Sequence, residues 1–423
     1  MTHHAETEKV LQVVDGITDE IVEFAADLVR IPTVNPPGAL YEVCAHTIGE
    51  RLKSFGFSVN YVAAEGLPEH SPTHPRVNVI GSRAGSVSRP LLHLNGHFDV
   101  VPPGYGWTLD PFGGIVRDGR LYGRGSADMK AGLAAAIYAA EAVRRAGVEL
   151  RGTIEVSGTV DEESGGMAGV AWLAQKGLIS SNKTDYVIIP EPLNVDCVCV
   201  GHRGVYWFDI TTYGRVAHGS MPFLGINAID QMNKVLNAIR EELVPELATR
   251  ITDMPVIPSQ ARYATINTNT IEGGQANQLM QTPCVADRCT VIFDRRFLPE
   301  EEFENVRGEV KELLKRLSIR TPDFRYDLQD RLIVQPMRTP EMSPVVVAVR
   351  DGVRSVLDRE ATLVASPGTY DHKHVTNIGG VTDCIAYGPG ALHLAHQPDE
   401  WCGIDDLVAA TKVLALSILK LVA

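Results

Sequence analysis

The chain has 423 residues and a formal net charge of −13, and 44% of its residues are hydrophobic. This composition is typical of a globular protein, and the length suits two domains better than one. The acidic charge disfavours a polyphosphate partner, so we expect no nucleic-acid binding.

The first 200 residues alternate apolar helices and strands. Thr18 is expected as the N-cap of a first helix, which ends before Ile31-Pro32, and a second helix runs from about Tyr41 to Phe55. Later elements are strands at 91–95, 153–160 and 186–190 and a helix at about 129–146. This alternation predicts an α/β layer structure with a mixed, largely parallel sheet that is flanked by helices.

The pattern changes near Arg203. From there we expect strands at 205–213, 264–271, 284–293 and 324–330 and helices at 227–243 and 300–317. The α/β pattern then resumes with a helix at 342–357, a strand at 381–387 and a final helix at 405–421. The sequence therefore predicts a discontinuous α/β domain at 1–203 and 333–423 and an inserted α+β domain at 204–332.

No sequence feature indicates membrane insertion or secretion. No apolar run reaches the roughly 20 residues of a membrane span, and residues 1–10 lack the pattern of a signal peptide. The seven cysteines are odd in number, and only Cys197 and Cys199 lie close together, which argues against a disulfide framework. We expect a cytoplasmic protein with no membrane partner.

Histidines and acids follow the predicted strands or begin helices. His97 and Asp99 lie two residues apart in extended chain and share a face, so Asp99 could accept the second N–H of a metal-bound imidazole. The simpler alternative is a strand-end histidine paired with its neighbour. Asp128 begins a predicted helix, where an N-cap carboxylate is the alternative to a ligand.

Three further stretches contain candidate ligands. Residues 161–163 are consecutive acids after a strand, which form either a solvated turn or a cation site. Glu191 lies between two prolines, which fix its backbone, and His396 precedes the last helix. Nitrogen and oxygen ligands without thiolates fit catalytic Zn²⁺, or Mn²⁺ or Co²⁺ in its place, and a carboxylate can bridge two ions. A neighbouring unbound carboxylate would serve as general base.

These stretches, in this order, resemble the M20 family of metallopeptidases and amidohydrolases, in the branch of acetylornithine deacetylases and succinyl-diaminopimelate desuccinylases. The similarity rests on residues 96–102, 123–132, 161–166, 190–192 and 396–400. It implies a zinc-hydrolase-type catalytic domain with an inserted lid or dimerisation domain. It also implies two Zn²⁺ per subunit, with Co²⁺ or Mn²⁺ as possible substitutes, and a homodimer.

The resemblance also assigns the metal ligands. Asp128 would bridge both ions, His97 and Glu191 would complete one site, and Glu163 and His396 would complete the other. It further implies a cis peptide bond between Asp128 and Met129.

The resemblance implies three catalytic roles. Glu162 becomes the general base and proton shuttle, Asp99 the partner of His97, and His218 a group that stabilises the oxyanion from the neighbouring subunit. Without the resemblance, His218 would be interpreted as an ordinary histidine in a turn between a strand and a helix.

Four residues are candidate substrate contacts. Asn277 matches the substrate-contacting asparagine of the family's glycine-rich loop. Arg296 could hold a substrate carboxylate as a planar fork, or form a surface salt bridge. His372 and His374 lie with Lys373 in a stretch that departs from the family pattern. These residues could recognise an anionic acyl group or carboxylate, or belong to a solvated loop.

The resemblance implies hydrolysis of an amide bond in a small N-acylated amino acid or close analogue, by a hydroxide that bridges the two metal ions. Glu191 stands where deacylases and carboxypeptidases of this type have glutamate, which disfavours an aminopeptidase. A metallo-carboxypeptidase or dipeptidase is the nearest alternative, and a non-catalytic metal-binding member is a further one. The acyl group and the amine stay open.

Overall fold

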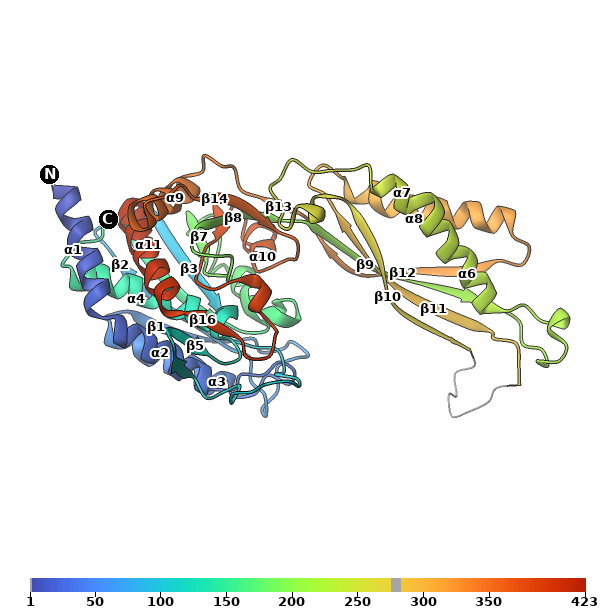
Figure 1. Cartoon of the computed structure of the whole chain (residues 1–423), viewed down its shortest axis with the longest axis horizontal. Helices are drawn as coiled ribbons and strands as arrows, with labels where there is room; N and C mark the ends of the chain where they lie inside the picture. The colour runs from blue at the N-terminus through green and yellow to red at the C-terminus, as the bar shows by residue number, and fades with distance from the viewer. Residues whose placement is uncertain (1, 275–282) are drawn as a thin grey trace. The chain divides into compact units, whose positions relative to one another are not determined.

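The computed structural model describes residues 2–274 and 283–423, which divide into two compact units (Figure 1). The α/β unit comprises Met1–Gly201, Thr339–Val364 and Tyr370–Ala423, and the inserted unit comprises His202–Arg338 and Ala365–Thr369. The boundaries expected from the sequence lie nearby, but they include residues 365–369 in the α/β domain. These residues group with the inserted unit because Ala365 forms a bridge with Val256.

The α/β unit is built around a mixed sheet. Its strand order is β1-β2-β6-β3-β7-β15-β8. The strands are β1 (Ser58–Ala63), β2 (Val77–Ala84), β3 (Leu91–His97), β6 (Thr153–Thr159), β7 (Tyr186–Ile189), β8 (Cys197–His202) and β15 (Cys384–Ala386). β3 pairs in parallel with both β6 and β7, and β15 pairs in parallel with β7. Antiparallel strands flank this parallel centre, so the predicted fold class is confirmed.

Helices cover the sheet of the α/β unit. They are α1 (Thr2–Gly16), α2 (Thr18–Arg30), α3 (Tyr41–Ser54), α4 (Ala131–Arg145), α5 (Trp172–Gln175), α9 (Pro344–Leu357), α10 (His372–Asn377) and α11 (Ile404–Val422). α11 packs against both α4 and α9. No helix within the described residues is long and apolar enough to cross a membrane.

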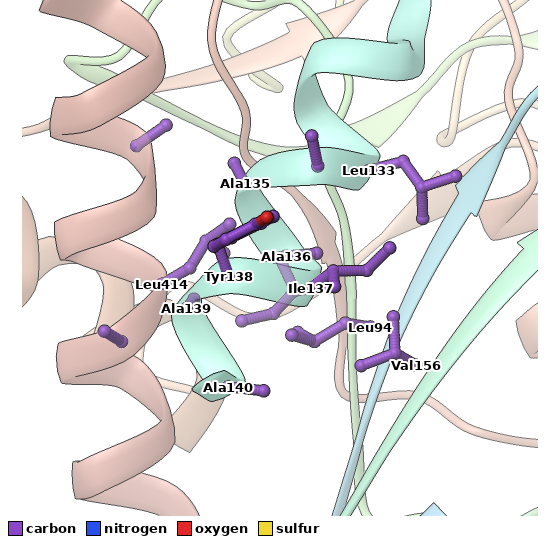
Figure 2. Packing of buried hydrophobic residues seen from close by; sticks show 14 of the residues in the cluster. Leu94, Leu133, Ala135, Ala136, Ile137, Tyr138, Ala139, Ala140, Val156 and Leu414 are labelled. Carbon is purple, nitrogen blue, oxygen red and sulfur yellow. The ribbon is translucent and has the colours of Figure 1, made fainter. Parts of the chain in front are cut away.

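Helix α4 lies in the middle of the core. Its residues from 131 to 143 are buried on every side, which is possible because six of the first ten are alanine and leave room for close neighbours. Figure 2 shows Ala139 on the side of Leu414 from α11, and Ile137 on the side of Leu94 and Val156 from the sheet. The predicted helix at 129–146 is thus confirmed. It packs against strands β3 and β6 of the sheet.

The predicted N-cap at Thr18 is wrong. A helix, α1, already precedes it, and the Thr18 hydroxyl donates back to the carbonyls of Val14 and Asp15. The apolar residues Val10, Val14 and Ile17 recur at helical spacing and are buried. Polar residues lie between them, and the sequence analysis therefore included no helix before Thr18.

The inserted unit is a four-stranded antiparallel sheet with helices. Its strand order is β10-β11-β9-β12. The elements are β9 (Gly204–Tyr213), β10 (Thr265–Gly274), β11 (Arg288–Phe297), β12 (Arg325–Val334), α6 (Ala228–Ala238), α7 (Val244–Leu247) and α8 (Phe303–Arg320). β11 begins and ends four residues later than predicted. Its end is charged, but Arg295 is buried beside Glu301, with nitrogen and oxygen 2.5 Å apart, so the strand continues through it.

Substitutions at two glycines test how closely α4 approaches the segment after β7 that carries Glu191. A Cβ on Gly132 would lie 2.0 Å from the carbonyl oxygen of Pro190, whereas a Cβ on Gly308, within α8, would meet nothing within 4 Å. We expect Gly132→Ala to lower the free energy of unfolding by about 2 kcal/mol through overpacking. Gly308→Ala should raise it by about 0.5–1 kcal/mol, since alanine has the higher helix propensity. Urea unfolding followed by circular dichroism measures both changes, and equal effects would contradict the close approach.

Candidate metal centre

The parallel centre of the sheet brings the candidate ligands to one edge. His97 ends β3, residues 161–163 follow the end of β6, and Glu191 follows the end of β7. Because β3 lies between β6 and β7 and runs parallel to both, the carboxyl ends of all three strands meet at the same edge. This edge is where open α/β sheets bind ligands.

Asp128 reaches this edge from the segment before α4. It lies in a short irregular turn, Ser126–Lys130, and its peptide bond to Met129 is cis, as the resemblance implied. The N-cap alternative is wrong, because the residue that precedes α4 is Lys130. The Asp128 carboxylate instead faces His97, with Oδ1 3.1 Å from the imidazole Nε2.

Two groups of three side chains share Asp128. His97, Asp128 and Glu191 form one, and Asp128, Glu163 and His396 form the other, and within each group the ligand atoms lie within 4.8 Å of one another. His396 Nε2 lies 3.0 Å from the Glu163 carboxylate and 3.6 Å from Asp128 Oδ2. The structure therefore brings together all five side chains that the sequence analysis selected as metal ligands.

The electrostatics of the centre fit cations. Burial and the neighbouring Asp128 carboxylate raise the pKa of Glu163 to about 7, and the same two causes raise the pKa of Glu191 well above its usual range. A divalent cation relieves the repulsion between such crowded carboxylates and reverses the rise in their pKa values. The oxygen and imidazole donors are those that zinc, manganese or cobalt accept.

Asp99 belongs to neither ligand group but contacts residues of the centre. The His97 Nδ1 atom lies 3.4 Å from the Asp99 carboxylate and also donates to its backbone carbonyl at 3.1 Å. The same carboxylate accepts the backbone N–H groups of Glu162 and Glu163, at 3.1 and 3.2 Å. Asp99 thus orients the imidazole, as the resemblance implied, and also fixes the turn that carries two further site residues.

Glu162 belongs to neither ligand group but lies beside them. Its Oε1 is 3.5 Å from the Nζ atom of Lys373, and both side chains are largely buried. Asp371 is buried next to this pair and accepts a hydrogen bond from Asn95 at 3.3 Å. Burial and the charge of Glu162 raise the pKa of Asp371 to about 7.

From the sequence, Lys373 was a candidate only for recognition of an anionic acyl group or carboxylate, together with the two histidines beside it. Its contact with Glu162 was not predicted. His372 and Lys373 do not belong to a solvated loop, because they lie in helix α10 and are buried. The helical turn sends Lys373 and the two histidines in different directions.

His372 and His374 both have partners within the α/β unit. His372 is fully buried, with its Nδ1 3.2 Å from the Tyr370 hydroxyl. His374 Nε2 donates to the carbonyl of Gly165 at 2.7 Å and so anchors the turn after Glu163. A direct contact of either ring with substrate stays a prediction.

The remaining selected residues belong to the inserted unit. His218 is exposed, and its Nδ1 accepts the backbone N–H of Ser220 at 3.2 Å and lies 2.7 Å from the Ser220 hydroxyl. Arg296 forms a fork with Asp294 on the same strand, at 2.8 and 3.0 Å. Asn277 lies outside the described residues. The roles of all three stay predictions.

Comparison with known proteins identifies the family. Residues 93–420, more than half of the chain, match Peptidase family M20/M25/M40. The chain belongs to this family. It is accordingly a hydrolase that acts on amide bonds, as the resemblance implied, and its family is metal-dependent.

Three known proteins of similar length align with this M20 chain. The N-formyl-4-amino-5-aminomethyl-2-methylpyrimidine deformylase of Bacillus subtilis is 28% identical over 428 residues, which cover 94% of this chain and 93% of that protein. The succinyl-diaminopimelate desuccinylase of Marinobacter nauticus is 28% identical over 408 residues, which cover 95% and 98%. The structure of human carnosine dipeptidase 1 aligns with a TM-score of 0.75 at 20% identity and covers 98% of both chains, which shows the shared fold.

The anchor formed by His374 predicts a pH dependence of stability in this M20 chain. Burial lowers the pKa of His374 to about 4, below the ~6.5 of an unfolded histidine. Between these values the unfolded chain binds more protons, so stability is present above pH 6.5 and is lost as the pH falls. His374→Gln keeps a donor for Gly165 and should reduce the slope of unfolding free energy against pH by about 1.4 kcal/mol per unit near pH 5.

The control is the same substitution at His393, which is exposed. Urea unfolding of the metal-free protein at several pH values gives the slopes. If His374→Gln and the wild type gave parallel curves, the buried neutral state of His374 would be contradicted.

Proposed function

We propose that the chain is a dinuclear metal-dependent amidohydrolase that removes the acyl group from an N-acylated amino acid or close analogue. The observation that carries this proposal is the pair of ligand groups that share Asp128, with the unshared carboxylate of Glu162 beside them. His97 and Glu191 would hold one cation with Asp128, and Glu163 and His396 the other. Bound Zn²⁺, or Co²⁺ or Mn²⁺, would polarise the scissile carbonyl and acidify a water molecule.

Glu162 is the proton carrier in this proposal. Its carboxylate takes a proton from the attacking water and later delivers it to the departing nitrogen, so that carboxylate and amine leave as separate products. The ammonium group of Lys373 lies 3.5 Å from Oε1 of Glu162 and forms an ion pair with this carboxylate. Asp99 fixes the backbone of Glu162 and keeps the carboxylate in place.

His218 completes the proposed site as a hydrogen-bond donor. Because its Nδ1 accepts from Ser220, the Nε2–H is available to an oxyanion. The resemblance to the M20 family implies that this histidine comes from the neighbouring subunit, so we propose a homodimer.

The names of the relatives support a deacylase. The deformylase and the desuccinylase are both named for the removal of an acyl group, and both align over almost their full lengths. The fold of carnosine dipeptidase 1 makes dipeptide hydrolysis the second candidate. Glu191, which the family pattern associates with deacylases and carboxypeptidases, is compatible with both.

Replacing Glu162 tests its role as proton carrier. Glu162→Gln keeps the size of the side chain but cannot accept the proton, so kcat should fall by at least about 100-fold. The metal content should stay unchanged, since Glu162 belongs to neither ligand group. Steady-state kinetics and elemental analysis measure the two quantities, with the exposed Glu149→Gln as control. A kcat within tenfold of the wild type would show that Glu162 is not the base.

A substrate panel tests the substrate class. We expect at least one N-formyl, N-acetyl, N-succinyl or N-carbamoyl amine to be hydrolysed with a higher kcat/KM than any dipeptide, because the named relatives remove acyl groups. Release of the free amine is the measurement. A consistent preference for dipeptides would replace the deacylase by a peptidase, and no hydrolysis of either class by the metal-loaded protein would contradict both.

A further inference from the structure

A buried ion pair outside the two ligand groups connects the segments that carry them. Arg124 precedes the turn with Asp128, and Glu400 follows the loop with His396. Their side chains are 2% and 0% exposed, and Nη1 of Arg124 lies 2.5 Å from Oε2 of Glu400. Neither residue has a role in the proposed reaction, and burying an ion pair is unfavourable unless further hydrogen bonds satisfy both charges.

The Glu400 carboxylate holds the backbone around Asp128. Its Oε1 accepts the N–H groups of Gly125, Ala127 and Asp128 at 3.0, 2.9 and 3.1 Å. Three donors converge on one oxygen because the chain turns sharply here, with Gly125 at a φ of +85° that a side chain would disfavour. The position of the Asp128 backbone therefore depends on Glu400.

The Arg124 guanidinium holds the loop with His396. Nη2 donates to the carbonyl of His396 at 3.2 Å and Nη1 to that of Gln397 at 3.3 Å. Nη2 also donates to Pro103, from the segment that follows β3. His396 itself adopts a positive φ of 63°, a conformation that needs support from its surroundings. The planar fork of arginine can reach these carbonyls and Glu400 together, which a lysine cannot do.

We propose that Arg124 and Glu400 are positioning residues that hold Asp128 and His396 at a fixed separation and thereby set the metal affinity of the site formed with Glu163. The inference rests on the proposed function, because it requires that these side chains bind metal. The pair acts through backbone atoms on two ligands that lie more than 260 positions apart in the chain. The site with His97 and Glu191 depends on the pair only through Asp128, so it should be affected less.

Metal titration of the full-length apoprotein tests the proposal. Co²⁺ is the probe, and visible absorption and calorimetry report its binding. We expect two ions to bind the wild type, and Glu400→Gln and Arg124→Lys to weaken one of them by about 10- to 100-fold. In Glu400→Gln the new amide still accepts the three backbone N–H groups, but its NH₂ meets the donors of Arg124.

Asp399→Asn is the matched control. Asp399 is the neighbour of Glu400, and its Oδ1 likewise accepts two backbone N–H groups, from Thr108 and Leu109 at 2.9 and 3.2 Å. That segment carries no candidate ligand, so Asp399→Asn should bind both ions as the wild type does. An equal loss of affinity in this variant would overturn the specific role of the pair.

A kinetic readout separates positioning from general damage. At low metal concentration both pair variants should have a kcat at least tenfold lower, with KM changed less than threefold, and excess metal should restore most of the activity. Arg124→Lys keeps the buried positive charge. If Glu400→Gln fails to fold, this variant tests the proposal by itself. If Arg124→Lys bound both ions with wild-type affinity, this inference would be overturned, but the proposed function would not be affected. If the wild type bound no Co²⁺, the proposed function would be overturned.

Discussion

Crowding of carboxylates at one edge of a parallel sheet is the constraint on which the rest of this structure depends. Asp128 and Glu191 lie close to His97, and Asp128 and Glu163 lie close to His396, with the ligand atoms of each group within 4.8 Å of one another. Burial and mutual repulsion raise the pKa values of the two glutamates, so the ionised centre is unfavourable by itself. Divalent cations reverse this balance. The geometry of the strand ends therefore fits the metal site that we propose.

The acids around this centre have two different roles: some are candidate metal ligands, and others accept backbone N–H groups. Asp99 accepts the N–H groups of Glu162 and Glu163, and Glu400 accepts those that surround Asp128. A backbone-bound carboxylate adds negative charge, but its hydrogen bonds satisfy that charge locally. The protein thus uses two buried acids to fix the turns that carry Asp128 and Glu163, which are candidate metal ligands.

Much of the site could be predicted from the sequence because it follows from local order. A strand that ends in His97, another that ends before three acids and a third that ends before Glu191 meet at one edge once they are parallel neighbours. Lys373 could not be predicted in the same way. It reaches Glu162 from more than 200 residues further along the chain, and its direction depends on the helical turn of α10.

The errors in the fold have the same physical origin as the residues missed in the site. Apolar periodicity located the buried strands and α4, but it failed where polar residues are buried or apolar ones are sparse. Arg295 continues β11 beyond its predicted end because Glu301 neutralises it. Arg124 was not selected from the sequence, yet it is buried beside Glu400, which pairs with it from 276 residues away. Charge pairs between distant segments are invisible to a local pattern. In this protein one such pair, Arg124 with Glu400, determines by our inference how tightly a metal is held.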